Sequence, residues 1–298
     1  MSLVPSREGL LDGLERLAEY RPSPVTRRVL GVAALIVFLV SLGVAFRHLP
    51  TLDLRPELLL VVAAGAAAVF GINAAELRIT GHLSRRRLSW SDAAEKTLWA
   101  TAANLLPVPG GSLIRLQAVA DGPDGWSRAT RCTLVPSTGW FAATFLAAGA
   151  ALAYLGASAF ALAALVLGLG GSLVTWLLMP PDRTSAETVV SLSALELGFV
   201  AASSLRLLAL FAALGHPIDP VAAVVLTTAA VLATAAGVFP GGLGLRELLS
   251  ATVAPLLGLP PSLAVLVSAL DRVVGLGTVS LLTAVHQLVA PEVEPASG

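Results

Sequence analysis

The chain has 298 residues, of which 56% are hydrophobic and 13% are charged, with a formal net charge of zero. A soluble domain carries about 25% charged residues, so this composition excludes an ordinary soluble fold and predicts an all-α polytopic membrane protein. The single cysteine, Cys132, excludes an intrachain disulfide and a thiolate metal cluster. The four histidines have no metal-ligand spacing, and no G-x-x-x-x-G-K-[ST] nucleotide loop is present. We therefore expect neither a metal nor a cofactor.

Residues 1–28 precede the first apolar run and are too charged to span a membrane. Their leucines fall on one helical face, which predicts a cytoplasmic amphipathic segment lying on the membrane surface. The alternative is a solvated cap on the cytoplasmic loops. A membrane-spanning helix takes about 20 apolar residues. The apolar runs that follow are Val29–Phe46, Leu58–Leu77, Thr97–Ala120, Cys132–Leu155, Ser158–Met179, Val189–Leu214, Val221–Leu257 and Leu263–Val289.

Two of these runs are interrupted by the same seven-residue pattern, P-G-G-x-x-aliphatic-Arg, which begins at Pro109 and again at Pro240. Paired Gly/Pro breaks in corresponding apolar segments point to a transporter's substrate site. The ten residues before the first break reach only about 15 Å, roughly half the hydrocarbon thickness. This predicts re-entrant helical hairpins, with a single kinked spanning helix as the alternative. The predicted gating residues are Pro109, Gly110, Gly111, Pro240, Gly241, Gly242 and Gly244.

The two motifs lie 131 residues apart, and the same offset places each apolar run of the first half inside a run of the second half. We therefore predict an internal duplication, with membrane repeats at 29–157 and 158–289 and a cytoplasmic tail at 290–298. Each repeat has three transmembrane helices and one re-entrant hairpin. Because three crossings is an odd number, the second repeat is inverted relative to the first.

The basic residues test this topology independently. In the re-entrant arrangement, 13 of them fall on one side of the membrane and only Arg47 and Arg55 on the other. The positive-inside rule makes the richer side cytoplasmic, so we expect both termini in the cytoplasm and the chain in the cytoplasmic (inner) membrane. The 13 residues are Arg7, Arg16, Arg21, Arg27, Arg28, Arg78, Arg85, Arg86, Arg87, Lys96, Arg128, Arg131 and Arg183.

Charged residues within the apolar runs carry the functional prediction. An ionisable residue at membrane depth costs at least about 2.5–3.5 kcal/mol, so it faces a partner or a water-filled cavity. We expect Arg115 and Arg246 at the start of the second half-helix of each hairpin, where free N–H groups and the helix dipole also attract an anion. The alternative is that Arg246–Asp271 and Glu247–Arg272 pair only to hold helices together.

The predicted substrate site holds a polar, phosphate-bearing lipid headgroup between the two halves. Arg115, Arg246 and Arg272 would hold the phosphate. Acidic residues would balance charge or relay protons, and these are Glu247, Asp271 and Glu196. Glu196 and Arg206 are ten residues apart on one run, so we expect them to face different partners, and their roles stay open.

The segment Val238–Glu247 (V-F-P-G-G-L-G-L-R-E), followed by Gly258-Leu259-Pro260 and Leu270-Asp271-Arg272, resembles the lysylphosphatidylglycerol synthase transmembrane family. Asn104-Leu105-Leu106-Pro107, with Gly111 and Arg115, resembles an earlier element of that family. The resemblance covers residues 29–289. It implies a bacterial protein that moves lipid between leaflets, and it adds Asn104 to the substrate site. The soluble aminoacyl-transferase domain of the family is missing, so we expect no synthesis of lysyl-lipid.

The sequence thus predicts a lipid flippase or transporter rather than an enzyme. One alternative is an integral-membrane glycosyl- or phosphotransferase acting on a lipid-linked donor, with Asp121 and Asp124 as its acidic pair. The other is a non-transporting partner subunit of a lipid-modifying enzyme. The expected partner is a membrane lipid, and a homo-oligomer or a lipid-modifying enzyme stays open as a further partner. No nucleic acid is expected, because the arginine clusters lie beside the membrane runs.

Overall fold

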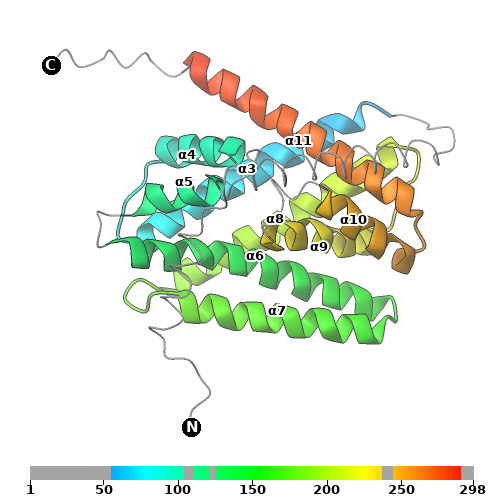
Figure 1. The fold of residues 1–298 in the computed structure, drawn as a ribbon, viewed down its shortest axis with the longest axis horizontal. Coiled ribbons are helices and arrows are strands. Elements are labelled where there is room, and N and C mark those ends of the chain that lie inside the picture. Colours follow the sequence, from blue (N-terminus) through cyan, green and yellow to red (C-terminus); the bar gives the residue numbers. More distant parts are fainter. Residues whose placement is uncertain (1–54, 104–109, 121–124, 237–243, 290–298) are drawn as a thin grey trace, which may run out of the picture.

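The computed structural model describes residues 55–103, 110–120, 125–236 and 244–289. Over these residues the chain is helical and contains no strand (Figure 1), which confirms the all-α class. The elements are α3 (Leu58–Leu83), α4 (Trp90–Ala103), α5 (Gly110–Val119), α6 (Trp126–Tyr154), α7 (Ser158–Leu178), α8 (Ala186–Ala213), α9 (Pro220–Ala236), α10 (Leu245–Val253), the 3-10 turn η3 (Ala254–Leu257) and α11 (Pro261–Val289).

Five of the described helices, α3, α6, α7, α8 and α11, are long and apolar enough to cross a membrane. This agrees with the predicted multi-pass membrane protein. The predicted amphipathic segment (1–28), the first apolar run and the tail (290–298) lie outside the described residues. The two broken runs form the short helix pairs α4–α5 and α9–α10, and their breaks, 104–109 and 237–243, also lie outside the described residues.

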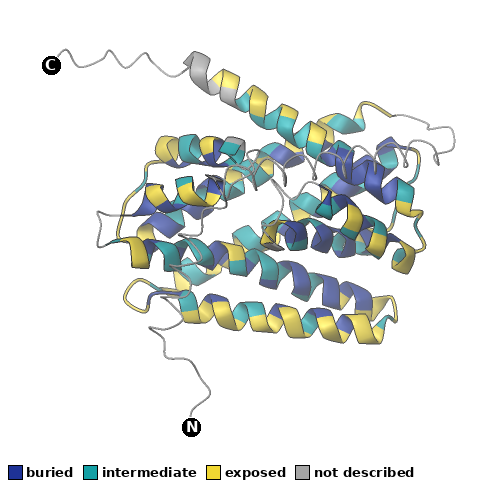
Figure 2. Ribbon diagram, in the orientation of Figure 1, coloured by how far each residue is buried: buried dark blue, intermediate teal, exposed yellow. Residues whose placement is uncertain are grey.

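Small residues bring α6 and α7 into close antiparallel contact, and the two helices lie side by side in Figure 1. A Cβ at Gly168 would lie 2.8 Å from the backbone nitrogen of Leu146, and a Cβ at Gly149 would lie 3.1 Å from that of Leu165. Glycines at such contacts allow membrane helices to approach each other. The opposite face of α7 is exposed in Figure 2. Its exposed large apolar side chains are Phe160, Leu162, Val166, Leu167, Leu169, Leu173, Val174, Trp176 and Leu177.

The helices α3 and α8 occupy equivalent positions under the 131-residue offset, and they pack against each other in opposite directions. At one end, the backbone N–H of Arg55, just before α3, donates to the carbonyl oxygen of Ala213, at the end of α8, at 2.8 Å. Further along, Ile72 on α3 lies against Gly198 on α8. The contacts therefore advance along α3 as they retreat along α8.

The contacts between α3 and α8 are arranged about equivalent residues of the two helices. A Cβ at Gly65 would lie 2.5 Å from Cγ of Arg206, so the early part of α3 faces the late part of α8. Between the contacts at Gly65 and Ile72, Phe70 of α3 lies at about the same height as Ala201 of α8. Phe70 and Ala201 are themselves related by the offset, so the two helices cross at equivalent points.

The short helix pairs also have equivalent neighbours. α4 packs on α3 and on α5, while its counterpart α9 packs on α8 and on α10. α5 packs on α6, and α10 packs on α11. α6 packs on α8, and α11 packs on α3. Most helix–helix contacts among these elements thus recur after exchange of the two halves, although α3 packs more closely on α5 than α8 does on α10.

The doubled motif does not fold identically in its two copies. α5 begins at Gly110 itself, whereas α10 begins only at Leu245, after Gly244. Gly244 has φ = +77°, a conformation that favours glycine, and its N–H donates to the carboxylate of Glu247 at 2.8 Å. The first copy has Leu113 at the position equivalent to Gly244, and no acid equivalent to Glu247. Its helix therefore continues toward the N-terminus through the glycines.

This difference corrects one prediction. Arg246 is the second residue of α10, at the helix start as expected, but Arg115 is the sixth residue of the ten-residue α5. Placing Arg115 at a helix N-terminus is therefore wrong, and the dipole argument holds for Arg246 alone.

Several basic residues predicted in loops lie in helices instead, namely Arg78, Lys96, Arg128 and Arg131. Arg128 lies in the first turn of α6, where it donates to the carbonyl oxygen of Leu83 at 2.9 Å and pairs with Asp182 at 3.0 Å. Arg85 pairs with the same carboxylate at 2.7 Å. The hydrogen bond from Arg85, together with that from Arg128, lowers the pKa of Asp182 to about 2. These contacts join the ends of α3 and α7 to the starts of α6 and α8.

Candidate functional site

A cluster of ion pairs joins α8, α10 and α11. Asp271 on α11 lies between two arginines, with Oδ2 2.5 Å from Nη2 of Arg246 and Oδ1 2.6 Å from Nη2 of Arg206. The Asp271 side chain is only 4% exposed, compared with 13% for Arg206 and 20% for Arg246. All three charges are therefore held largely away from solvent and depend on one another.

Glu247 and Arg272 complete this cluster. Oε1 of the fully buried Glu247 accepts a hydrogen bond from Nη2 of Arg272 at 3.2 Å, and Oε2 accepts the one from Gly244 N–H. The two pairings that the sequence offered as an alternative, Arg246–Asp271 and Glu247–Arg272, are both present. Among the described residues, the cluster has three guanidinium groups and two carboxylates. It therefore carries one surplus positive charge, which suits an anion.

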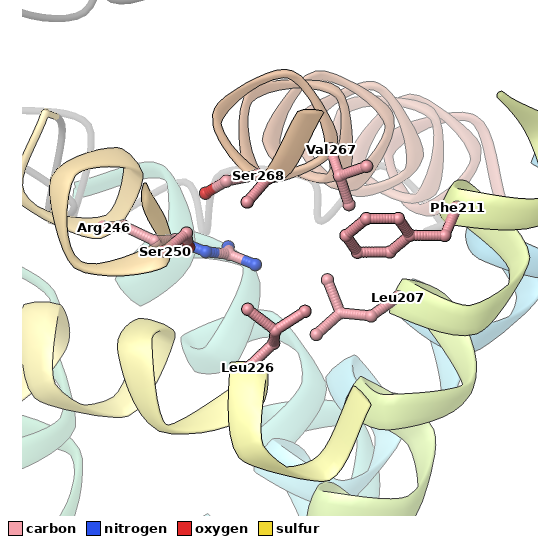
Figure 3. Close-up of a pocket in the computed structure, with 8 residues that line it drawn as sticks. Leu207, Phe211, Leu226, Arg246, Ser250, Val267 and Ser268 are labelled. Atoms are coloured by element: carbon pink, nitrogen blue, oxygen red, sulfur yellow. The ribbon is translucent and has the colours of Figure 1, made fainter. Parts of the chain in front are cut away.

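A small hollow opens beside Arg246 (Figure 3). Its guanidinium reaches into the hollow from α10, and the Ser268 side chain comes from α11. Among the described residues, the buried Ser268 Oγ has no hydrogen-bond partner. The hollow measures about 10 Å³, room for about one water, so this conformation is closed to a lipid headgroup. It is lined by Leu207, Phe211, Leu226, Arg246, Ser250, Ala264, Val267 and Ser268.

Another polar cluster joins α3, α5 and α6. We call it the first cluster and the ion pairs of α8, α10 and α11 the second cluster, after the halves of the chain that supply most of their residues. Glu76 is 1% exposed, and its Oε1 accepts a hydrogen bond from Nε1 of Trp140 at 2.5 Å. Arg115 donates to Oδ1 of Asn73 at 3.1 Å, and its guanidinium carbon lies 5.7 Å from the Trp140 ring centroid, within cation–π range. Trp140 also stacks on Phe199 of α8 at 4.9 Å. Neutral groups thus hold Arg115 in place.

Glu196 on α8 approaches the same turn of α6. A Cβ at Gly139 would overlap the Glu196 carboxylate, so the lack of a side chain at Gly139 makes room for it. Glu76 bonds to Trp140, the next residue. Both carboxylates therefore meet the same turn of α6, and Glu76 lies close enough to Glu196 and Arg115 for their charges to act on it.

The two clusters lie at opposite ends of the α3–α8 crossing. Glu196 and Arg206 are ten residues apart on α8, which corresponds to about 15 Å along the helix. Glu196 contacts Gly139, whereas Arg206 pairs with Asp271. The expectation that Glu196 and Arg206 face different partners is confirmed. In the described part of the chain, no group of three or more His, Cys, Asp or Glu side chains is placed to hold a metal ion.

The structure brings some of the predicted site residues together and separates others. Arg246, Glu247, Asp271 and Arg272 form one cluster, whereas Arg115 belongs to the other. The predicted residues outside the described part of the chain are Asn104, Pro109, Pro240, Gly241 and Gly242, as are Asp121 and Asp124 of the enzyme alternative.

Sequence reasoning assigned no role to the residues that organise the first cluster. Asn73 and Glu76 lie three residues apart within an apolar helix, a spacing that puts both on one helical face. That spacing is a signal available from the sequence. Trp140 carries no such signal, because one tryptophan in an apolar run is an ordinary lipid- or core-facing residue.

The second half of the chain has a recognisable relative. Residues 182–283 match the lysylphosphatidylglycerol synthase TM region. Over this segment the family resemblance predicted from the sequence is confirmed. A comparison with the curated proteins gives no match.

The matched segment contains every charged residue of the second cluster, from Arg206 to Arg272, as well as Glu196. The match therefore covers the ion pairs and the hollow beside Arg246, and it supports a membrane function related to lipid. The first cluster draws Asn73, Glu76, Arg115 and Trp140 from residues before the matched segment.

Proposed function

We propose that this protein is a lipid flippase or transporter that moves a phosphate-bearing lipid headgroup between the leaflets of the cytoplasmic membrane. One observation carries the proposal: within the described residues, the second cluster holds three arginines against two largely buried carboxylates, and unmatched charge is costly in such surroundings. A lipid phosphate supplies the missing negative charge. Arg246 faces the hollow and also lies at the N-terminus of α10, where free N–H groups favour an anion.

The path of the headgroup runs between the two clusters. Arg246 and Arg272 bind the phosphate at one end of the α3–α8 crossing, and Arg115 binds it at the other. The separation of about 15 Å along α8 is half the hydrocarbon thickness of about 30 Å. The acyl chains stay in lipid beside the exposed apolar helices, while only the headgroup crosses.

The proposal includes an inverted-topology repeat with two re-entrant hairpins, α4–α5 and α9–α10. Two observations support it. The equivalent helices α3 and α8 cross antiparallel near equivalent residues, and most contacts of the first half recur in the second. Inverted repeats of this kind place a substrate site between the halves near the midplane, with one repeat rocking against the other.

We also place both termini in the cytoplasm of a bacterial cell. Arg85 after α3, Arg128 at the start of α6 and Asp182 between α7 and α8 were all predicted on the cytoplasmic side. Their mutual ion pairs support a common side for these connections, which are rich in arginine.

Lipid movement by the purified protein tests this function. The full chain is reconstituted in phosphatidylcholine vesicles containing a fluorescent phosphatidylglycerol, and an external reductant bleaches the probe that reaches the outer leaflet. We expect protein-dependent bleaching of inner-leaflet probe and at least a tenfold slower rate for Arg246→Ala. Arg183→Ala, at an exposed arginine, is the matched control and keeps the parent rate. No movement by the parent protein, or an unchanged rate in Arg246→Ala, would refute the proposal.

One observation favours a second candidate, a non-transporting partner subunit of a lipid-modifying enzyme. In the second cluster each carboxylate is paired with arginine, and the hollow is the size of one water. A subunit that only docks needs no larger cavity. The same vesicle assay separates the two candidates, because a docking subunit moves no probe when it is the only protein present.

A further inference from the structure

We propose that Glu76 and Glu196 form a proton-binding site that is coupled to the binding of the anionic headgroup at Arg115. This inference rests on the proposed transport function and adds to it an energy source, namely a proton that moves with the lipid. It is carried by the placement of two carboxylates and one arginine around a single turn of α6.

The geometry of Glu76 leaves room for a proton. One carboxylate oxygen accepts the Trp140 N–H, while the other, Oε2, is buried and has no hydrogen-bond partner among the described residues. The side chain is 1% exposed. A proton on Oε2 leaves the Trp140 hydrogen bond intact and removes the charge from a site with almost no solvent.

The charge balance of the first cluster is the reverse of that of the second. With both carboxylates ionised, Glu76 and Glu196 outweigh Arg115 by one negative charge, and neither forms an ion pair within the described residues. Like charges on nearby carboxylates disfavour the state in which both are ionised. The first cluster therefore suits one added positive charge, such as a proton, whereas the second cluster suits an anion.

Within the described residues, the helices packed around Glu76 and Glu196 supply no charge to this site beyond that of Arg115. α5 brings Arg115, α6 brings Trp140 and Gly139, and α9 has no charged residue. The other charged side chains of α4, α6, α8 and α11 have partners elsewhere or are exposed. On α4, Asp92 accepts a hydrogen bond from Ser89, and Glu95 pairs with Lys96. On α6, Arg128 pairs with Asp182, and Arg131 donates to carbonyl oxygens of α7. On α8, Glu187 is exposed. Arg206 of α8 belongs to the second cluster, as do Asp271 and Arg272 of α11.

Coupling follows from the position of Arg115. Its partner Asn73 lies three residues before Glu76, on the same face of α3. When Glu76 carries a proton, Arg115 keeps its neutral partners and its charge is available to a phosphate. When Glu76 loses the proton, it attracts Arg115 and competes with the phosphate. Proton and anion therefore bind together and leave together.

A proton fits this site better than Na⁺. Hard metal cations take six or more oxygen ligands, whereas the hydrogen bond to the Glu76 carboxylate among the described residues comes from an indole N–H. Sodium is therefore the outcome that the experiment is designed to exclude.

The test uses the full chain in vesicles with fluorescent phosphatidylglycerol, as above, under a gradient of one pH unit. One proton per lipid shifts the distribution of probe between leaflets by up to about tenfold, because a pH unit equals a tenfold ratio. Glu76→Gln keeps the shape and the Trp140 hydrogen bond but cannot lose a proton. We expect this variant, and Glu196→Gln, to exchange probe without any shift. Glu187→Gln, at the exposed start of α8, is the matched control and keeps the parent shift.

A second measurement does not depend on transport. The infrared spectrum of the parent protein at neutral pH should contain a protonated-carboxyl band that is lost in Glu76→Gln or in Glu196→Gln. If the parent moves no probe, the transport proposal fails and this band alone decides the proton site. Movement that ignores the pH gradient, or that follows a Na⁺ gradient instead, overturns the inference while leaving transport intact. Absence of the band overturns it as well.

Discussion

Replacement of Asp271 by asparagine tests the second cluster most directly. The carboxylate is 4% exposed and serves two arginines at 2.5 and 2.6 Å. Asparagine keeps the size and removes the charge, which leaves Arg206 and Arg246 without their common counter-ion. Removing one member of a buried ion pair costs about 3–5 kcal/mol. Arg246 is 20% exposed and already reaches into the hollow, whereas Arg206 is 13% exposed and packed on Gly65, so most of the cost falls on Arg206.

The expected effect is large enough to measure by thermal unfolding. At about 2–4 °C per kcal/mol for a chain of this order of size, Asp271→Asn lowers the Tm by about 6–20 °C. The assay follows the monodisperse fraction of protein in detergent after heating. Adding Arg206→Met to Asp271→Asn removes the stranded cation and should recover at least a third of the loss. A Tm of Asp271→Asn within about 2 °C of the parent would refute the reasoning. So would a Tm of the double variant that falls below that of Asp271→Asn by the same amount again.

Three further predictions follow from single positions. Gly168→Val places side-chain atoms against the backbone of α6 and should lower the Tm. Gly170→Val, with open space around its Cβ, should leave the Tm near that of the parent. Equal Tm values for the two variants would contradict the close packing of α6 and α7. Gly244→Ala, at φ = +77°, should destabilise the start of α10 by about 1–2 kcal/mol, and Gly244→Asn should destabilise it less. Hydrogen exchange at the first amides of α10 measures the difference, and equal exchange in the two variants argues against backbone strain at this position. Asp182 has its pKa lowered from 3.8 to about 2 by Arg85 and then Arg128, so its stabilising contribution is present above about pH 4 and is lost toward pH 2. The Tm difference between the parent and Asp182→Asn should therefore be the same at pH 7 and pH 5 and should shrink below pH 4; a difference that changes between pH 7 and pH 5 contradicts this assignment.

The sequence was informative wherever an apolar run was long and uninterrupted. The runs that became α3, α7 and α8 were placed correctly to within a few residues, except that α3 continues through Glu76 and Arg78 to Leu83. Charged residues look like a helix end when hydropathy alone is considered. Here Glu76 is buried against Trp140, and Arg78 stacks on Trp90 with its guanidinium carbon 4.1 Å from the ring centroid. Tertiary partners that hydropathy does not record let the helix continue.

The candidate site was predictable where the charges were close in sequence to the doubled motif. Arg246, Glu247, Asp271 and Arg272 were named, and their pairing was foreseen as one alternative. The position of Arg115 was predicted wrongly, because the two copies of the motif look alike but only the second has the glycine and the capping acid that stop a helix. The first cluster depends on contacts between residues about 40 to 65 apart, and a single sequence does not reveal such pairs.

The antiparallel crossing of α3 and α8 has a mechanical consequence. The two helices contact each other at several levels, from Arg55 and Ala213 to Ile72 and Gly198. Near one end Arg206 lies against Gly65, and toward the other Glu196 lies against Gly139 of α6. A shift of α8 against its neighbours therefore changes the surroundings of both clusters in the same movement.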